Sequence, residues 1–482
     1  MLELAHGRVA LAGKLLADAS SMTLGRMTTL TTWFRRAAGN AYVLAQLAGQ
    51  KGLPFAPRER IERLRDARVR RLVRYAAATV PFYREMFQRL SIDPREIRRA
   101  NDLERLPLVE KDEVRRDPER FVSTSRLGRN SIPFVTSGST GERVCIRHDR
   151  LGLLANIAFG ERERQVIART IGMQAGYREA MISYPGGTVD KVFAFYRDHT
   201  YLPVRPHRLF LSVRSTLREN VDALNRFRPH VLFAYGSYLE ELARAVSRGI
   251  LELVPPKVLI YGAEPVAREM WPEIEQTLGA PLLSQYNAVE AFKVAYLCER
   301  RTDFHVHEDL VHVRILGADG GTAKDGERGC VVLSNLVNRG TVLLNYRLTD
   351  LASFASDPCP CGRTLRALVA VDGRAEDVVL LEDGELLHPR AIWGAIKPHA
   401  EILQYQMVQE APRRFLLKLV TSDRDAYQRV SASLAREVEV LLGIGAKVET
   451  VRCSELPREA GGKVRTVVAL PRRSGESTGL GV

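Results

Sequence analysis

The sequence has little cysteine and no long apolar run, and each absence excludes a class of protein. Six cysteines in 482 residues are too few for a disulfide framework. No uninterrupted apolar run is long enough to span a bilayer. The first residues lack the order of charge, apolar core and cleavage site of a signal peptide, because polar and charged side chains interrupt them: Glu3, His6, Arg8 and Lys14. We therefore expect a cytoplasmic protein.

Acidic side chains are also scarce relative to basic ones. The chain has 57 Asp and Glu against 71 Lys and Arg, a formal net charge of +14. This excess favours acidic partners such as nucleotides, coenzyme A, anionic lipid or nucleic acid. Nucleic acid is disfavoured, since no basic stripe is interleaved with aromatic residues. Residues 1–56 are predicted to be a helical extension that packs on the body of the protein, with contact to a membrane surface as the alternative.

The length and the strand pattern predict more than one domain. A chain of 482 residues exceeds a typical single domain. Continuous apolar strands over 231–236, 257–262 and 282–286 alternate with helices, which is typical of a largely parallel α/β sheet. Residues 305–350 are β-rich, and beyond residue 378 short strands and helices indicate a small α+β domain. Residues 471–482 are rich in Gly, Ser and Arg, and we predict that they are disordered.

A run of small residues, Val135-Thr136-Ser137-Gly138-Ser139-Thr140-Gly141, follows the end of a short buried strand. The two glycines let backbone N–H groups approach an anion closely, and the hydroxyl residues add donors. This combination suits the triphosphate of a nucleotide, with an ordinary Gly/Ser turn as the alternative. It is not a Walker loop, because Glu142 and Arg143 follow where that loop needs Lys and Ser or Thr.

Other candidate residues lie at the carboxyl ends of the predicted strands, where ligands of parallel α/β sheets bind. Gly262-Ala263-Glu264 and Tyr286-Asn287-Ala288-Val289-Glu290 occupy two such ends. Taken singly, Glu290 is consistent with a carboxylate at a helix start, Asp350 with a turn residue and Lys463 with a solvated lysine. Only the order of these segments along the chain favours a functional role for these residues over the structural explanations.

Six segments in this order resemble the core motifs of the AMP-forming adenylating enzymes, and most closely the phenylacetate–CoA ligase-like branch, which includes capsule-biosynthesis adenylating proteins. The segments are Thr136–Gly141, Tyr261–Pro265, Tyr286–Glu290, Tyr346–Asp350, Gly373–Asp377 and Gly461–Lys463. Residues 75–84, 106–111 and 457–465 also resemble that branch. The likeness extends over roughly residues 60–470, and six motifs in order are far more specific than one.

The resemblance implies a fold and a reaction. The fold would be α/β, with a large N-terminal adenylating domain of parallel sheets and a β-rich subdomain over residues 57–372. A hinge over residues 373–377, at Asp377, would join it to a small mobile α+β domain over residues 378–470. The enzyme would activate a small carboxylic acid with ATP to an acyl-adenylate, release pyrophosphate and pass the acyl group to the thiol of CoA. The alternatives are transfer to an amine, a hydroxyl or a carrier protein, or a non-catalytic nucleotide-binding protein.

The resemblance also implies a role for each motif. The phosphate-binding residues would be Ser137, Gly138, Ser139, Thr140 and Gly141. The adenine slot would be lined by Tyr261, Gly262, Ala263 and Glu264, with Tyr286 against the base. Asp350 would accept hydrogen bonds from the ribose, and Arg374 would reach ribose or phosphate. Glu290 would help to hold Mg²⁺, and Lys463 would bridge the carboxylate and the α-phosphate in the transition state.

Two positions depart from the pattern. Many relatives have Gly where Asn287 stands, and Ser or Thr where Val289 stands. That hydroxyl often touches the phosphate or the acyl carboxylate, so its absence bears on the rate or the type of substrate. The candidate walls of the acid pocket are Tyr184, Tyr235, Phe292 and Tyr238.

A second candidate site is a metal centre. Cys298, His305, Cys359 and Cys361 form a plausible tetrahedral zinc set of three thiolates and one imidazole. His307 is an alternative ligand in the same hairpin, and buried or loop thiols without a metal are the alternative to a site. Four protein ligands leave no open position, so this zinc would be structural.

Overall fold

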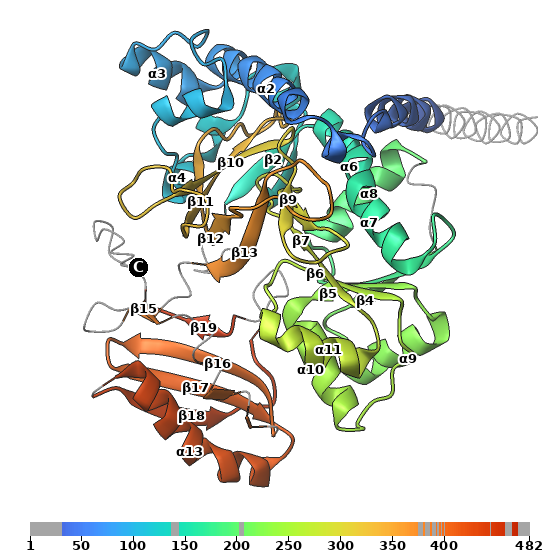
Figure 1. Ribbon diagram of the computed structural model, residues 1–482, viewed down its shortest axis with the longest axis vertical. Coiled ribbons are helices and arrows are strands. Elements are labelled where there is room, and N and C mark those ends of the chain that lie inside the picture. Colours follow the sequence, from blue (N-terminus) through green and yellow to red (C-terminus); the bar gives the residue numbers. More distant parts are fainter. Residues whose placement is uncertain are drawn as a thin grey trace, which may run out of the picture.

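The computed structural model describes residues 31–135, 144–201, 207–374, 401–443, 445–457 and 465–470, together with single residues and pairs between 379 and 399. Figure 1 shows a large body built around one sheet, with a smaller body of strands β16 to β18 and helix α13 beside it. Within these ranges, no helix combines the length and the apolar character needed to cross a membrane.

Eleven of the described strands form one sheet, in the order β10-β11-β12-β13-β9-β8-β7-β6-β5-β3-β4. The last five strands of this order, from β7 to β4, pair in parallel as the sequence predicts, and the others pair antiparallel. The parallel strands are β3 Arg178–Ser183, β4 His207–Ser212, β5 Val231–Tyr235, β6 Val258–Gly262 and β7 Leu282–Tyr286. The antiparallel strands are β8 Ala295–Leu297, β9 Phe304–Val306, β10 Val311–Leu316, β11 Gly329–Asn335, β12 Tyr346–Phe354 and β13 Ala367–Arg374.

Helices cover the inner parallel strands β5 and β6, which explains their continuous apolar sequences. Three consecutive residues of β6, Val258 to Ile260, are buried, so both faces of this strand are covered. Helix α9 (Leu217–Phe227) begins at a capping box, in which the hydroxyl of Thr216 accepts a hydrogen bond from the backbone of Glu219. Helices α10 (Gly236–Ser247) and α11 (Trp271–Leu278) connect β5 to β6 and β6 to β7.

Of the remaining helices of the large body, α2 to α7 precede β3 in the chain and α8 connects β3 to β4 (Figure 1). They are α2 Arg58–Thr79, α3 Pro81–Leu90, α4 Lys111–Arg116, α5 Arg126–Arg129, α6 Arg150–Phe159, α7 Glu161–Ile171 and α8 Thr188–His199. The short 3₁₀ helices are η1 Leu53–Phe55, η2 Ala100–Arg105, η3 Pro118–Phe121 and η4 Arg268–Met270. Helices α6 and α7 are separate elements rather than one helix, because the chain breaks at Gly160.

The described part of the N-terminal extension packs on the large body. Residues 31–47 are helical, and the side chain of Asn40 accepts a hydrogen bond of 2.9 Å from the backbone of Tyr201, after α8. Val43 is buried in a cluster with residues of α6 and α8. Residues 1–30 lie outside the described residues.

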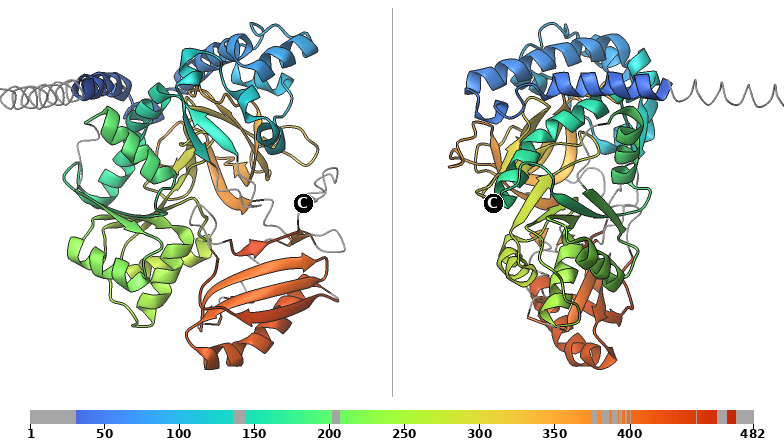
Figure 2. Two further views of the ribbon diagram at one scale, coloured as in Figure 1. Left: turned by 180° about the vertical axis from the view of Figure 1, so that it is seen from behind. Right: turned by 90° about the vertical axis from the view of Figure 1, so that its right-hand side faces the viewer.

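The smaller body has its own core. A four-stranded sheet, β18-β17-β16-β19, packs against α13 (Arg424–Leu442). Its strands are β16 Ile402–Ala411, β17 Arg414–Thr421, β18 Lys447–Arg452 and β19 Val467–Val468, and a separate pair is β14 Val379–Leu380 with β15 Leu386–Leu387. Helix α10 of the large body lies beside it, since a guanidinium N–H of Arg244 donates to the carbonyl of Leu403 at 2.6 Å. Figure 2 shows the two bodies from behind and from the side.

Candidate functional site

Two of the predicted nucleotide segments, Tyr261–Pro265 and Tyr286–Glu290, meet at the carboxyl edge of the parallel strands. Tyr235 of β5 lies opposite Gly262 of β6, which in turn lies opposite Gln285 of β7, so the three strands end side by side. Ala263 follows with a φ of 68°, a left-handed conformation that costs a non-glycine residue about 1–2 kcal/mol. Such strain persists where the surroundings require it, which is common at ligand sites.

Two side chains at this edge are already engaged in the fold. The carboxylate of Glu264 accepts a hydrogen bond of 3.0 Å from the backbone N–H of Ser237, in the first turn of α10, where a helix favours negative charge. The ring of Tyr261 is buried and packs edge-on against Trp271 of α11, with ring centroids 6.0 Å apart. Segment 261–264 therefore presents mainly backbone to a ligand at this edge.

Tyr286 and Asp350 are brought together from distant strands. The phenolic O–H of Tyr286 donates to a carboxylate oxygen of Asp350 at 2.6 Å. Asp350 lies in β12, which is separated from β7 by three strands, β13, β9 and β8, in the order of the sheet. Its backbone is paired with that of Arg374 in β13. Three of the residues that the resemblance assigns to the nucleoside thus converge.

Glu290 lies in a tightly held loop after β7. The residue is 9% exposed, and its carbonyl accepts a hydrogen bond of 2.8 Å from the side-chain amide of Asn335. The preceding carbonyl, of Val289, lies 2.6 Å from Nε2 of His148. Phe292 adopts a φ of 61°, so the loop turns sharply just after Glu290. The backbone that carries this carboxylate is thereby fixed from two sides.

The predicted phosphate loop connects two paired strands. β1 (Ile132–Val135) pairs antiparallel with β2 (Cys145–His148), and Val135 lies opposite Cys145. The loop residues Ser137, Gly138, Ser139, Thr140 and Gly141 lie outside the described residues, as do Asp377, Lys463 and the side chain of Arg374.

Sequence reasoning missed several residues that organise this site. Asp149 caps α6 by accepting from Gly152 at 2.9 Å, and it also accepts from the backbone of Arg339 at 2.8 Å. The pattern of Asp before a helix was the available signal for Asp149. His148 and Asn335 have no such signal, because their partners are backbone groups of remote segments.

The candidate walls of the acid pocket have different environments. Tyr184 and Tyr235 lie at the carboxyl edge, where the hydroxyl of Tyr235 accepts from the backbone of Tyr184 at 3.3 Å. Tyr238 is a core residue instead: it is 2% exposed, and its hydroxyl accepts from the amide of Asn220 at 2.9 Å. The ring of Phe292 packs against His148, with centroids 4.2 Å apart.

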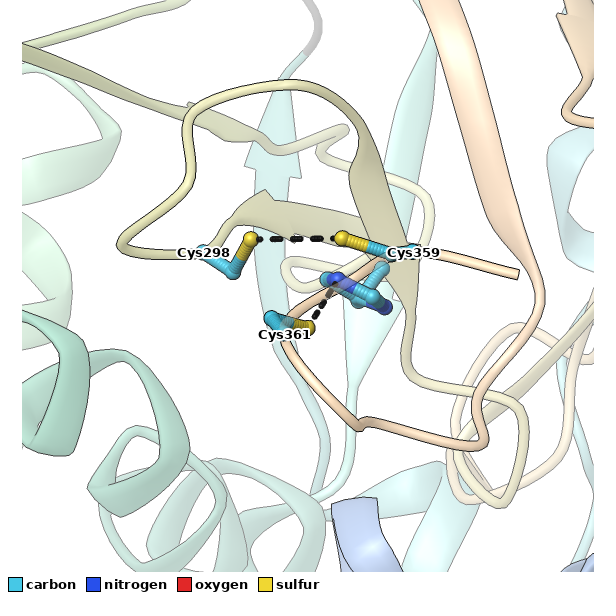
Figure 3. A group of neighbouring side chains, drawn as sticks. Cys298, Cys359 and Cys361 are labelled. Atoms are coloured by element: carbon cyan, nitrogen blue, oxygen red, sulfur yellow. Dashed lines mark hydrogen bonds between the residues drawn. The ribbon is translucent and has the colours of Figure 1, made fainter. Parts of the chain in front are cut away.

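The metal-ligand candidates converge in one place. Cys298 follows β8, His305 lies in β9, and Cys359 and Cys361 lie in the loop between β12 and β13. Their ligand atoms all lie within 4.8 Å of one another. Figure 3 shows the three labelled thiols gathered around one point.

The spacing of these atoms fits a tetrahedral ion. The Sγ atoms of Cys298 and Cys359 are 3.7 Å apart, and a tetrahedron with zinc–sulfur bonds of about 2.3 Å has edges of about 3.8 Å. Sγ of Cys361 lies 3.3 Å from Nε2 of His305 and accepts from the backbone of Arg363 at 3.5 Å. Burial, and less strongly the neighbouring Cys361 and Cys359, raise the pKa of the Cys298 thiol to about 12. A bound divalent cation would favour the thiolate form and so offset this rise in pKa.

His307, the alternative ligand, belongs to a buried ionic cluster. Arg162, whose side chain is fully buried, donates to Asp309 at 2.7 and 2.9 Å and to Nδ1 of His307 at 3.1 Å. Because a guanidinium only donates, Nδ1 accepts and Nε2 carries the hydrogen that points to Glu163, 3.3 Å away. Lys293, which lies shortly after Glu290, forms an ion pair with Glu163.

Charge pairing stabilises the ionised forms within this cluster. Burial alone would raise the pKa of Glu163, but Lys293 and His307 lower it to about 2. Burial likewise opposes the ionisation of Asp309, and Arg162 and Arg68 lower its pKa to about 2. Burial lowers the pKa of His307 to about 4. The cluster therefore joins α7 to the segment that carries Glu290 and two of the metal ligands, Cys298 and His305.

Comparison with known proteins agrees with this geometry. No protein-family model matches the chain. The chain is 27% identical over 459 residues to the phenylacetate–coenzyme A ligase of Thermus thermophilus, covering 87% of this chain and 99% of the relative. It is 22% identical to the phenylacetate–coenzyme A ligase of Escherichia coli, covering 84% of this chain and 93% of the relative. These likenesses confirm the resemblance drawn from the motifs.

Solved structures confirm the fold. A 2-hydroxyisobutyryl-CoA ligase, in the postadenylation state with an acyl-adenylate, has a TM-score of 0.68 and 18% identity, covering 88% of this chain and 92% of that one. The same ligase in the thioesterification state, with 2-HIB-AMP and CoA, has a TM-score of 0.57 and 19% identity, covering 87% and 91%. The predicted α/β architecture of a large sheet domain with a smaller α+β body is therefore correct.

Proposed function

We propose that this chain, a relative of the phenylacetate–coenzyme A ligases along most of its length, is an AMP-forming acid–thiol ligase. It activates a carboxylic acid with ATP and transfers the acyl group to CoA. The observation that carries the proposal is the convergence of Tyr286, Asp350 and the backbone of residues 262–264 at the carboxyl edge of the sheet. Nucleotides bind at this edge in open α/β sheets.

The first step joins the acid to the nucleotide. A carboxylate oxygen attacks the α-phosphorus of ATP, and the bond to the bridging oxygen breaks, releasing pyrophosphate. We assign the adenine to the backbone of residues 262–264 and the ribose hydroxyls to the carboxylate of Asp350, with Arg374 nearby. Residues 137–141 would receive the outgoing phosphates on backbone and hydroxyl donors.

Two charged residues would stabilise this step. Glu290 is a hard oxygen ligand suited to Mg²⁺, which supplies positive charge to the phosphates when bound. Lys463 would donate to the oxygens shared by the carboxylate and the α-phosphate. Negative charge accumulates there in the transition state, and a preorganised donor stabilises it more than the ground state.

The second step transfers the acyl group. The sulfur of CoA attacks the carbonyl carbon of the acyl-adenylate, the carbon–oxygen bond to AMP breaks, and the thiol proton is released. Lys463 is needed close to the site in the first step, whereas the thiol needs an open path in the second. We propose a hinge over residues 373–377, between domains over 57–372 and 378–470, that lets the smaller domain turn between the steps.

The metal centre is assigned a structural role. Cys298, Cys359, Cys361 and His305 offer four ligands and leave no open position for chemistry, and three thiolates with one imidazole favour zinc over Mg²⁺. The site would fasten the loop between β12 and β13 to β8 and β9. The latter strands follow the loop that carries Glu290.

A two-part assay tests the proposal. Purified protein is mixed with ATP, Mg²⁺ and a panel of carboxylic acids, beginning with phenylacetate because the relatives are named for it, and pyrophosphate release is followed. CoA is then added and the thioester is measured by mass spectrometry. Pyrophosphate release without a thioester would indicate an amine, hydroxyl or carrier acceptor. No release with any acid would favour a non-catalytic nucleotide-binding protein.

A further inference from the structure

His148 connects two parts of the nucleotide site that are far apart in sequence. It is the last residue of β2, on the far side of the predicted phosphate loop from β1. Its Nε2 atom lies 2.6 Å from the carbonyl oxygen of Val289. A carbonyl only accepts, so the Nε2 atom carries the hydrogen and donates it. The partner is the residue directly before Glu290.

The environment of His148 fixes the ring in this orientation. The residue is 4% exposed, and its ring packs against Phe134, with centroids 5.6 Å apart, and against Phe292, with centroids 4.2 Å apart. Burial lowers its pKa to about 4, so the imidazole is neutral near pH 7. A neutral, enclosed imidazole is a rigid donor with little rotational freedom to lose.

The Val289–Glu290 segment depends on such outside support. The side chain of Val289 has no hydrogen-bonding group, so this position is held through its backbone. The carbonyl of Glu290 is held in the same way by Asn335, whose amide oxygen in turn accepts from the backbones of Val337 and Asn338 at 3.1 and 3.2 Å. The left-handed φ of Phe292 just beyond shows that the turn is imposed by its surroundings.

We infer that His148 is a positioning residue that holds the backbone carrying the Glu290 carboxylate in the place where that carboxylate would bind Mg²⁺. The inference rests on the proposed function, in which Glu290 holds Mg²⁺. His148 touches neither metal nor nucleotide in this account. It acts through the backbone of Val289, as an outer hydrogen-bond partner acts on a metal ligand.

The test compares three substitutions at this position. His148→Leu removes the donor and keeps an apolar side chain in the cavity. His148→Gln places an amide N–H near the position of Nε2, and His148→Asn places one nearer to Nδ1. ATP binding is measured by calorimetry with Mg²⁺ and with EDTA, so that the Mg²⁺-dependent part of the affinity is separated from the rest. The same proteins are assayed for kcat and KM of pyrophosphate release.

His148→Leu is expected to reduce the Mg²⁺-dependent gain in ATP affinity and kcat about 10- to 100-fold, the usual cost of losing an outer partner of a metal ligand. The KM for the acid should change little. His148→Gln should retain most of the Mg²⁺-dependent affinity and kcat that His148→Leu loses, and His148→Asn should not. The matched control is His199→Leu, since His199 also contacts a backbone carbonyl, of Phe195 at 3.0 Å, and stacks on an aromatic ring, yet lies in α8.

The outcomes separate this inference from the proposed function. A folded His148→Leu that keeps the full Mg²⁺-dependent affinity overturns the inference alone. The same is true if His148→Gln and His148→Asn behave alike, a comparison that decides the matter even if His148→Leu does not fold. An equal loss in His199→Leu would mean general destabilisation and would also overturn it. Absence of ATP binding by the wild-type protein would overturn the proposed function together with the inference.

Discussion

The phenolic oxygen of Tyr286 lies 2.6 Å from a carboxylate oxygen of Asp350, although the two residues are separated by 64 positions in the sequence. Tyr286 ends the last parallel strand, and Asp350 lies in an antiparallel strand of the β-rich part of the sheet. The bond therefore joins the two halves of the sheet at the edge where we place the nucleotide. Both residues belong to motifs that the resemblance assigns to the nucleoside.

Asp350→Ala should weaken ATP binding by removing the acceptor for the ribose hydroxyls. A hydrogen bond to a charged group contributes about 1.5–3 kcal/mol, so we expect a roughly 10- to 100-fold rise in the KM for ATP. Tyr286→Phe removes only one hydroxyl and should have a smaller effect of the same kind. Tyr427→Phe is the control, because its hydroxyl donates to the carbonyl of Thr450 within the smaller body. An unchanged KM for ATP in Asp350→Ala would refute the assignment.

Lys463→Ala should impair adenylate formation while leaving ATP binding nearly intact. Its contact is strongest in the transition state, and loss of one such donor typically lowers kcat about 10²–10³-fold. Lys447→Ala, at an exposed position of β18, is the control. The measurements are pyrophosphate release and calorimetric ATP binding on the same preparation. Normal release by Lys463→Ala would rule out the proposed role.

Purified protein should contain about one zinc per chain, as four protein ligands predict. Strong chelators should lower the melting temperature, and so should Cys359→Ser. Cys330→Ser is the matched control, since Cys330 is also a buried thiol but lies in β11, outside the ligand cluster. Metal analysis that finds no zinc in freshly purified protein, or equal losses in the two variants, would contradict the site.

The buried ionic cluster predicts a loss of stability in acid. Glu163 and Asp309 have folded pKa values of about 2, below their ordinary values of 4.5 and 3.8. The unfolded chain therefore binds more protons, and the stabilisation is full above pH 5 and lost as pH falls toward 2. The pKa of His307 is also lower in the folded chain, about 4 against 6.5, so this residue likewise makes the folded state less stable as the pH falls.

This pH dependence can be measured by urea unfolding between pH 7 and pH 3. Asp309→Asn should be less stable than the wild type at pH 7, with a smaller further loss on acidification. Asp112→Asn is the control, because Asp112 pairs with Arg115 at an exposed position. If the free energy of unfolding falls by the same amount between pH 7 and pH 3 in the wild type and in Asp309→Asn, the cluster is not the source of the acid sensitivity.

The sequence was most informative where a pattern is local. Strands such as β6 could be predicted because burial on both faces demands a continuous apolar run, Val258 to Ile260. The four metal ligands could be proposed from residue types alone, yet the choice of His305 over His307 could not. That choice depends on β9 ending at Val306, because the next residue, His307, directs its side chain to Arg162 of the ionic cluster.

Contacts between distant segments gave no local signal. The bond from His148 to Val289 spans 141 positions, and that from Asn335 to Glu290 spans 45. Each uses a backbone acceptor, which every residue carries, so no side-chain pattern marks it. Glu264 and Tyr261 were placed correctly at the strand end, but the burial of the Tyr261 ring follows from the packing of α11 against β6.

The most direct test of the proposed chemistry uses an acid labelled with ¹⁸O in its carboxylate. The acid, identified by the pyrophosphate assay, is incubated with ATP, Mg²⁺, CoA and the wild-type protein, and the nucleotide product is analysed by mass spectrometry. In the proposed reaction a carboxylate oxygen bonds to the α-phosphorus and stays there when the thiol breaks the carbon–oxygen bond. The account therefore predicts AMP that carries one ¹⁸O atom per thioester formed; unlabelled AMP, or ADP with labelled phosphate, would contradict it.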